Sequence, residues 1–242
     1  MNSREELERN LAQVAETIEA ACRRAQRLRS EVTLIAVTKM HPPAAIAAIA
    51  ELGVTHIGEN KVQEFDSKQS EWTTLRGSYN LHAHLIGHLQ SNKAARAATL
   101  FDAIDSVDSL RLAERLEAGA AANDRILPIL IEIKLSEEES KSGLGPQSAE
   151  LEQFLDRVAG LTHLNLRGLM TVPPYLRDAE AVRPYFRQLR ELRDVCARRH
   201  PRLQLNALSM GMTHDYAVAI EEGATEIRLG TALFGARDYG RA

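Results

Sequence analysis

Two hydrophobic patterns alternate along the 242 residues of this chain. Short apolar runs are typical of buried strands, and they are separated by segments in which apolar residues recur every three or four positions, as on one face of a helix. The predicted strands cover residues 32–39, 54–58, 81–86, 101–107, 126–135, 166–171, 205–210 and 225–229. Helices are predicted at 3–22, 44–52, 109–122, 148–158, 178–199 and 213–222, and another follows 59–61 and runs through Trp72.

This alternation predicts right-handed βαβ units joined into a parallel sheet. Eight such units suit a closed (β/α)8 barrel of the TIM type, which usually has about 250 residues. We therefore expect a single barrel domain over residues 1–242 that begins with an extra N-terminal helix, since Ser3 and Glu6 have capping-box spacing. An open doubly wound sheet is the alternative, but its glycine-rich dinucleotide turn is missing after the first strand.

Charge and composition exclude several classes of protein. Hydrophobic residues make up 44% of the chain and charged residues 26%, as expected of a globular protein with a core. A net charge of −3 argues against nucleic acid as a partner, since phosphate neutralisation needs clustered Lys and Arg. No apolar run has membrane-spanning length and the N-terminus lacks a signal-peptide core, so we expect a cytoplasmic protein with no membrane partner. Cys22 and Cys196 lie far apart without metal-binding spacing, and we interpret them as reduced thiols.

The first predicted strand ends in a lysine, Lys39. A strand that is covered on both faces cannot solvate an ammonium group unless its end opens into a cleft. Lys39 is therefore a candidate site residue. Position alone equally allows a lysine that follows the strand and points into water, so the choice depends on the rest of the chain.

The last two predicted strands run into segments rich in glycine and hydroxyl groups, at 209–213 and 230–231. In (β/α)8 barrels the loops after strands seven and eight often bind phosphate. Glycine lets the backbone approach an anion, and the hydroxyl groups of Ser209, Thr213 and Thr231 can donate hydrogen bonds to it. Glycines that only shape turns are the alternative.

Ionisable residues also stand within the predicted strands. Arg228 interrupts an apolar run, so it either pairs with a carboxylate or faces a ligand at the barrel mouth. His82, His84 and His88 suggest a metal site at first, but no Cys, Asp or Glu stands near them in the sequence, and strand histidines are more often hydrogen-bonded core or rim residues. We therefore expect no metal. The acidic segment 137–139 is expected to be a solvated loop.

A barrel with a strand-one lysine and a C-terminal phosphate cradle describes a pyridoxal-phosphate site, in which the lysine forms an imine with the cofactor aldehyde. Eight segments also resemble the pyridoxal phosphate homeostasis proteins, which are single-domain barrels similar to the N-terminal barrel of alanine racemase. These segments are AVTK at 36–39, GENKVQE at 58–64, HLIGHLQSNK at 84–93, SVD at 106–108, EESKSG at 138–143, RGLM at 167–170, LSMGM at 208–212 and IRLGTALFG at 227–235.

The resemblance implies a set of cofactor-binding residues. They are Lys39, which carries pyridoxal 5′-phosphate, Asn60 and Met210 beside it, Ser209, Thr213, Gly230 and Thr231 at the phosphate, and Arg228 at the pyridine nitrogen. A guanidinium cannot accept a proton, so the ring nitrogen would stay unprotonated and the cofactor would be a weak electron sink.

The resemblance therefore implies a non-catalytic carrier or regulator that binds pyridoxal phosphate and supports vitamin B6 homeostasis. We expect it to act as a monomer and to pass the cofactor to the apo forms of enzymes that depend on it. A racemase-like enzyme on the same barrel is the alternative. In alanine racemase a second domain supplies an acid/base group, and only seven residues follow Gly235 here, so the carrier is favoured.

Four residues depart from the family pattern. Ala83 stands where tryptophan is frequent, Lys134 where asparagine is usual, Glu137 where glycine is common, and His214 where an acid is frequent. Lys134 is the departure expected to matter, because an added cation near the mouth would alter the electrostatics around an anionic cofactor.

Overall fold

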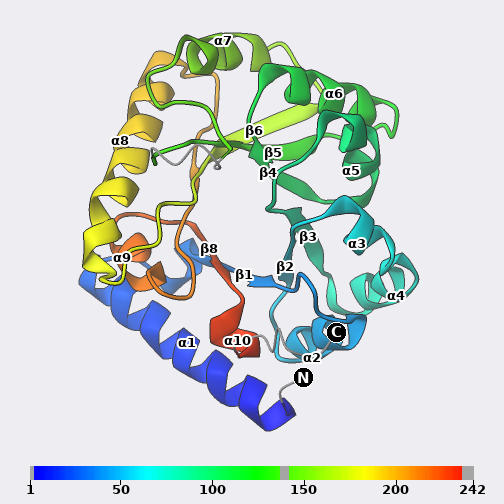
Figure 1. The fold of residues 1–242 in the computed structure, drawn as a ribbon, viewed down its shortest axis with the longest axis vertical. Helices are drawn as coiled ribbons and strands as arrows, with labels where there is room; N and C mark the ends of the chain where they lie inside the picture. The colour runs from blue at the N-terminus through cyan, green and yellow to red at the C-terminus, as the bar shows by residue number, and fades with distance from the viewer. Residues whose placement is uncertain (1–2, 137–141, 236–242) are drawn as a thin grey trace.

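The parallel strands of this chain close into a barrel. The computed structural model describes residues 3–136 and 142–235, and its eight strands follow one another in chain order, with β1 beside β8 (Figure 1). The strands are β1 (Thr33–Val37), β2 (His56–Glu59), β3 (His82–Leu85), β4 (Ala103–Val107), β5 (Leu127–Glu132), β6 (Leu164–Met170), β7 (Ala207–Ser209) and β8 (Glu226–Leu229). Thr33 pairs with Glu226 and joins the first strand to the last, so the (β/α)8 prediction is confirmed and the open sheet is wrong.

Helices surround the barrel (Figure 1). They are α1 (Arg4–Arg24), α2 (Pro43–Glu51), α3 (Val62–Asp66), α4 (Gln69–Tyr79), α5 (Ala94–Leu100), α6 (Leu110–Ala121), α7 (Ala149–Val158), α8 (Arg183–Arg199), α9 (Tyr216–Glu221) and α10 (Thr231–Phe234). The sequence prediction merged α3 and α4 and missed α5, and it extended the first strand to Lys39, whereas β1 ends at Val37. Among the described residues, no helix is long and apolar enough to cross a membrane.

The N-terminal helix α1 is an addition to the barrel, as predicted. Its capping box is present: the Ser3 hydroxyl accepts from the Glu6 amide at 3.2 Å, and the Glu6 carboxylate accepts from the Ser3 amide at 2.9 Å. The helix packs along α9 and α10 (Figure 1), where the side-chain amide of Asn10 donates to the Leu233 carbonyl at 2.9 Å. Segments from the two ends of the chain therefore pack together.

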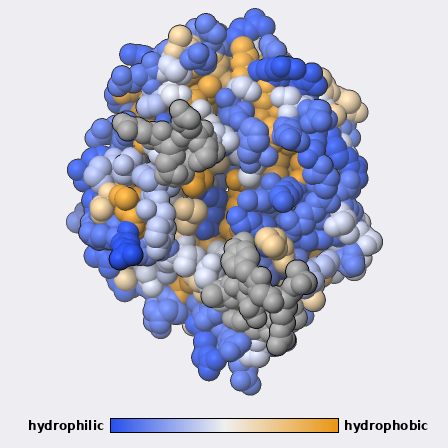
Figure 2. Space-filling model, viewed as in Figure 1, coloured by the Kyte–Doolittle hydropathy of each residue, from blue (hydrophilic) through white to orange (hydrophobic). Residues whose placement is uncertain are grey.

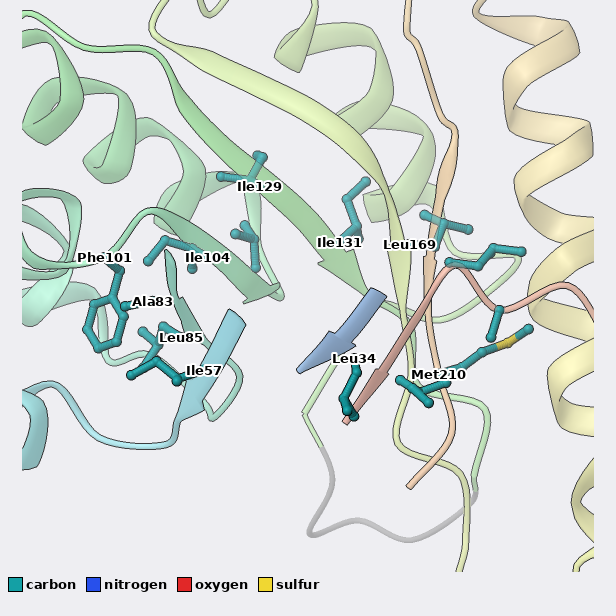
Figure 3. Packing of buried hydrophobic residues seen from close by; sticks show 14 of the residues in the cluster. Leu34, Ile57, Ala83, Leu85, Phe101, Ile104, Ile129, Ile131, Leu169 and Met210 are labelled. Atoms are coloured by element: carbon teal, nitrogen blue, oxygen red, sulfur yellow. The ribbon is translucent and has the colours of Figure 1, made fainter. Parts of the chain in front are cut away.

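Strand residues alternate between the two sides of the barrel wall. Leu34 belongs to a continuous buried cluster that includes helix residues, and Figure 3 shows members from other strands, such as Ile57 and Ile131. The other side points into the barrel, where a β-carbon on Gly58 would lie 3.1 Å from Ile35. On the face in Figure 2 the surface is mainly hydrophilic, and hydrophobic residues gather around its middle.

The two cysteines are buried in separate helices. Cys22 lies in α1 and Cys196 in α8, and both are free thiols. Burial raises the pKa of each thiol, so both are poor nucleophiles near neutral pH.

Candidate functional site

A pocket opens at the carboxyl ends of the strands, the end at which (β/α)8 barrels carry their sites. Its cavity of about 460 Å³ lies within the usual range for small-molecule sites. Six of the residues proposed from the sequence line it, namely Lys39, Asn60, Thr213, Arg228, Gly230 and Thr231. These residues come from the loops after β1, β2, β7 and β8 and from β8 itself, so the closed barrel brings distant segments to one place.

Lys39 lies in the turn that follows β1, and its half-buried side chain lines the pocket. Thr38 continues the strand pairing, since its amide donates to the Gly58 carbonyl at 3.0 Å. The His41 amide donates back to the Thr38 carbonyl at 3.0 Å and closes the turn, with Met40 at a φ of 62°. The structure thus places Lys39 on the pocket wall rather than out in the solvent.

Asn60 follows β2 and lies against the loop after β3. A β-carbon on Gly87 in that loop would lie 2.5 Å from the carbonyl oxygen of Asn60 and 2.9 Å from its Cα, so only glycine fits there. The Ser106 hydroxyl donates to the Gly87 carbonyl at 2.7 Å and ties the loop to β4. Contacts from β2, β3 and β4 therefore fix the position of Asn60.

Arg228 projects from β8 into the barrel, where the residue is 4% exposed. Its Nη1 donates to the Ser209 hydroxyl at 2.7 Å, and its Nη2 donates to the Thr171 carbonyl at 2.8 Å. Burial lowers the pKa of the guanidinium, and nearby carboxylates, first of all Asp105 and Glu132, counteract that effect. Because arginine remains charged in proteins, the side chain presents a fixed cationic donor to the pocket.

The loops after β7 and β8 are joined at the pocket. The Thr213 hydroxyl accepts from the Ala232 amide at 3.1 Å, so Thr213 lies beside the 230–232 segment. Thr213, Gly230 and Thr231 thus present two hydroxyl groups and a glycine backbone from adjacent loops. Such a set is suited to hold a phosphate.

Similarity to known proteins identifies the family. A family model described as the N-terminal domain of alanine racemase matches residues 10–238. A pyridoxal phosphate homeostasis protein of Aquifex aeolicus is 42% identical over 229 residues, which cover 95% of this chain and 97% of that protein. The chain belongs to the pyridoxal phosphate homeostasis protein family.

Two further proteins extend the comparison. The pyridoxal phosphate homeostasis protein of Escherichia coli K12 is 42% identical, with 96% of this chain and 97% of that protein covered. The solved structure of PipY from Synechococcus elongatus, with PLP bound, is 41% identical and covers 92% of this chain and 100% of PipY, with a TM-score of 0.80. The family resemblance predicted from the sequence is therefore confirmed.

Two residues that the family resemblance assigned to the cofactor do not line the pocket. The Ser209 hydroxyl accepts from Arg228 and is fully buried behind it. Met210 is fully buried in the hydrophobic cluster between the barrel and its helices. Because neighbouring strand residues point to opposite sides, the end of β7 cannot present both side chains to one ligand.

His88, Glu132 and Tyr175 line the pocket but were not proposed from the sequence as cofactor-binding residues. Glu132 is 8% exposed; burial raises the pKa of its carboxyl, Asp108 adds to this, and Arg228 opposes it. Glu132 interrupts an apolar strand as Arg228 does, so the same signal could have found it. Tyr175 is 77% exposed and follows no such pattern.

The departures from the family pattern differ in their distance from the site. His214 lines the pocket, and its Nε2 lies 2.8 Å from the Arg177 carbonyl, to which it can donate. Lys134 is half-buried and is not among the described residues that line the pocket. Ala83 is buried in the hydrophobic cluster between the barrel and its helices. Glu137 lies outside the described residues. His214, rather than Lys134, is therefore the described departure that reaches the pocket.

The closed barrel gives one of the strand histidines acidic neighbours that are distant in the sequence. His84 lies inside the barrel, where possible ligand atoms of His84, Asp105 and Glu226 come within 4.8 Å of one another. These residues lie in β3, β4 and β8, which are far apart in the sequence and meet only in the closed barrel. These groups already have protein partners: His84 bonds to His56 at 2.9 Å and to Asp105 at 3.0 Å, and Arg167 lies 3.2 Å from Glu226. The cluster is thus a buried polar network.

Proposed function

We propose that this chain binds pyridoxal 5′-phosphate in the pocket at the carboxyl end of the barrel and holds it as an imine on Lys39. The observation that carries the proposal is the convergence in one cavity of the Lys39 amine, the Arg228 guanidinium and the hydroxyl groups of Thr213 and Thr231. An aldehyde needs an amine, a pyridine nitrogen accepts a hydrogen bond, and a phosphate needs donors, so these residues fit the cofactor. PLP-bound PipY supports the proposal.

Arg228 limits the chemistry that the pocket supports. Bound pyridoxal phosphate supplies an electron sink whose strength depends on the protonation of its ring nitrogen. Arg228 can donate a hydrogen bond to that nitrogen but cannot protonate it, and its contacts with Ser209 and Thr171 hold it in place. This favours storage of the cofactor over carbanion chemistry.

The physiological role that follows is homeostasis of vitamin B6. A protein that binds pyridoxal phosphate reversibly limits the concentration of the free aldehyde and can supply the cofactor to apo enzymes. We propose that the chain does so as a monomer in the cytoplasm, without strong catalysis of its own. The names of its relatives, which are homeostasis proteins, support this role.

Visible absorbance before and after borohydride reduction tests the ligand and the lysine together. The wild-type protein loaded with pyridoxal phosphate should show an imine band, and reduction should fix the cofactor on the peptide that contains Lys39. Lys39→Ala should lose the band, whereas Lys93→Ala, as a control, should keep it. A modified peptide centred on Lys93 or Lys141 would contradict the assignment.

Transfer of the cofactor distinguishes a carrier from a racemase-like enzyme. Loaded protein mixed with the apo form of an unrelated enzyme that depends on pyridoxal phosphate should restore that enzyme's activity, while a borohydride-reduced sample should not. The loaded protein should not exchange the α-proton of alanine at an enzymatic rate. Rapid solvent-deuterium incorporation at Cα that is lost in Lys39→Ala would favour the racemase-like alternative.

A further inference from the structure

Three ionic residues lie directly behind the turn that carries Lys39. Lys68, just before α4, is 6% exposed, and Glu59, the last residue of β2, is fully buried. Glu64 in α3 completes the group, which we name the Lys68 cluster. Its members come from the segment between β2 and α4, yet their contacts reach across to the loop after β1.

The ammonium group of Lys68 has three N–H donors, and the structure gives it three acceptors. Its Nζ lies 2.8 Å from Glu59 Oε1, 3.0 Å from Glu64 Oε1 and 3.2 Å from the carbonyl oxygen of Thr38. Thr38 directly precedes Lys39, so one of the three bonds holds the turn itself. The planar guanidinium of an arginine would not present the same three directions.

Both carboxylates of the Lys68 cluster extend the contacts with the turn. The Thr38 hydroxyl donates to Glu59 at 2.7 Å, and the Met40 amide donates to Glu64. The cluster therefore contacts the chain on both sides of Lys39. Met40 has a φ of 62°, which is unfavourable for a residue with a side chain, and the bond to Glu64 supports that conformation.

Stability alone does not explain the Lys68 cluster. Buried ions give up their hydration, and well-packed apolar residues in the same place are often as stabilising or more so. Burial raises the pKa of the Glu59 carboxyl even though Lys68 and Thr38 bond to it, so these partners do not fully offset its desolvation. The bonds of the cluster instead fix the positions of Thr38 and Met40, the two neighbours of Lys39.

We infer that the Lys68 cluster is a positioning device that fixes the turn after β1 and holds the Lys39 amine where an imine can form. This inference rests on the proposed function. Because Glu59 also directly precedes Asn60, the cluster links the two loops that bring Lys39 and Asn60 to the pocket. Lys68 itself is not among the described residues that line the pocket, so it acts through Lys39.

Two ligands separate positioning from a general loss of structure. Pyridoxal phosphate needs the Lys39 amine, whereas pyridoxine 5′-phosphate carries an alcohol in place of the aldehyde and does not. Lys68→Met should weaken pyridoxal phosphate binding by about tenfold to a hundredfold and slow imine formation, because small misplacements of a reacting group have effects of that size. Its affinity for pyridoxine phosphate should stay at the wild-type value.

Two more variants complete this experiment. Glu64→Gln removes one charge from a partly exposed residue, and it should shift the pyridoxal phosphate affinity in the same direction even if Lys68→Met folds poorly. Arg96→Met breaks the exposed ion pair with Asp66 in α3 and should leave both ligands unaffected. Unchanged imine formation in both cluster variants, or equal losses for the two ligands, would overturn the inference.

Hydrogen exchange in the cofactor-free protein gives a readout that does not depend on the proposed function. The Met40 and His41 amides, which bond to Glu64 and Thr38, should exchange faster in Lys68→Met than in the wild type and in Arg96→Met. Equal exchange rates would overturn the inference. A wild-type protein that forms no imine would instead contradict the proposed function, and the exchange rates would still test the cluster.

Discussion

At the scale of single residues, Arg228 connects the pocket to the polar interior of the barrel. Its guanidinium donates to the Ser209 hydroxyl and the Thr171 carbonyl, and the negative charges of Asp105 and Glu132 favour its charged form. Arg228→Gln removes the guanidinium that donates to the buried Ser209 hydroxyl and Thr171 carbonyl, so the free energy of unfolding in urea should fall by about 1–3 kcal/mol. Arg96→Gln, which removes a guanidinium from the surface, should change it little. If the free energy of unfolding falls no more for Arg228→Gln than for the control, the buried hydrogen bonds of Arg228 do not stabilise the barrel.

Thr231 tests the phosphate end of the pocket. Thr231→Ala removes one charge-assisted hydrogen bond, worth roughly 1.5–3 kcal/mol, so the Kd for pyridoxal phosphate should rise by about tenfold to a hundredfold. The Kd for pyridoxal, which has no phosphate, should not change. Thr99→Ala is a matched control, since its hydroxyl donates to a carbonyl of its own helix at 3.1 Å. Equal losses for the two aldehydes would place the phosphate elsewhere.

Unusual residues within apolar strands were informative at this scale. Lys39 and Arg228 were found because a charge interrupts or ends a buried run, and Glu132 carries the same signal. Ser209 and Met210 show the limit of a motif: it gives the segment near a site, but the alternation of strand side chains decides which of them line the pocket.

At the scale of elements, the loop after β3 depends on a close backbone contact. Gly87→Ala should push this loop away from Asn60 and weaken pyridoxal phosphate binding by about tenfold or more. Gly77→Ala in α4 is the control, because beyond the backbone of its own helix no atom lies within 4 Å of the added β-carbon. That control should bind normally and gain about 0.4–1 kcal/mol in the free energy of unfolding. Normal cofactor affinity in Gly87→Ala would show that the loop can adjust.

Element boundaries were harder to predict than the elements themselves. The helix predicted through Trp72 is broken between α3 and α4, at Ser67 and Lys68. There the Lys68 side chain turns inward to Glu59 and Glu64, and such tertiary contacts leave no trace in the local periodicity. The short helix α5 was missed because its alanine-rich sequence has little amphipathic contrast.

At the scale of the whole molecule, alternating strands and helices predicted the closed barrel, but the contacts inside it arise only on closure. His84 lies between a carboxylate and a second imidazole: its Nδ1 is 3.0 Å from Asp105 and its Nε2 is 2.9 Å from His56 Nδ1. Burial acts to lower the pKa of His84, but the charge and hydrogen bond of Asp105 outweigh it and raise the pKa. A protonated His84 donates to both partners, so His56 must accept and stay neutral.

The pH dependence of stability follows from this arrangement. Burial, followed by repulsion from His84 and His82, lowers the pKa of His56 to about 4. In the unfolded chain a histidine has a pKa of about 6.5, so between these values the unfolded state binds the proton and the folded state does not. The contribution of His56 is therefore fully present above about pH 6.5 and is lost as the pH falls toward about 4. Because the ring is partly exposed, we expect a loss of about 1–3 kcal/mol, below the full value for such a shift.

Two other buried groups contribute to the pH dependence with the opposite sign. The pKa of His84 is raised in the folded state, so its contribution to stability is present at low pH and is lost as the pH rises through this raised pKa. Burial raises the pKa of the Glu226 carboxyl, which therefore also favours the folded state in acid. The change in the free energy of unfolding of the wild-type protein with pH therefore does not isolate the contribution of His56. Urea denaturation of wild type and His56→Gln at several values between pH 4 and 7 isolates the contribution: the stability difference between them should shift in favour of the variant as the pH falls. Parallel curves for the two proteins would show that His56 is not held neutral inside the barrel.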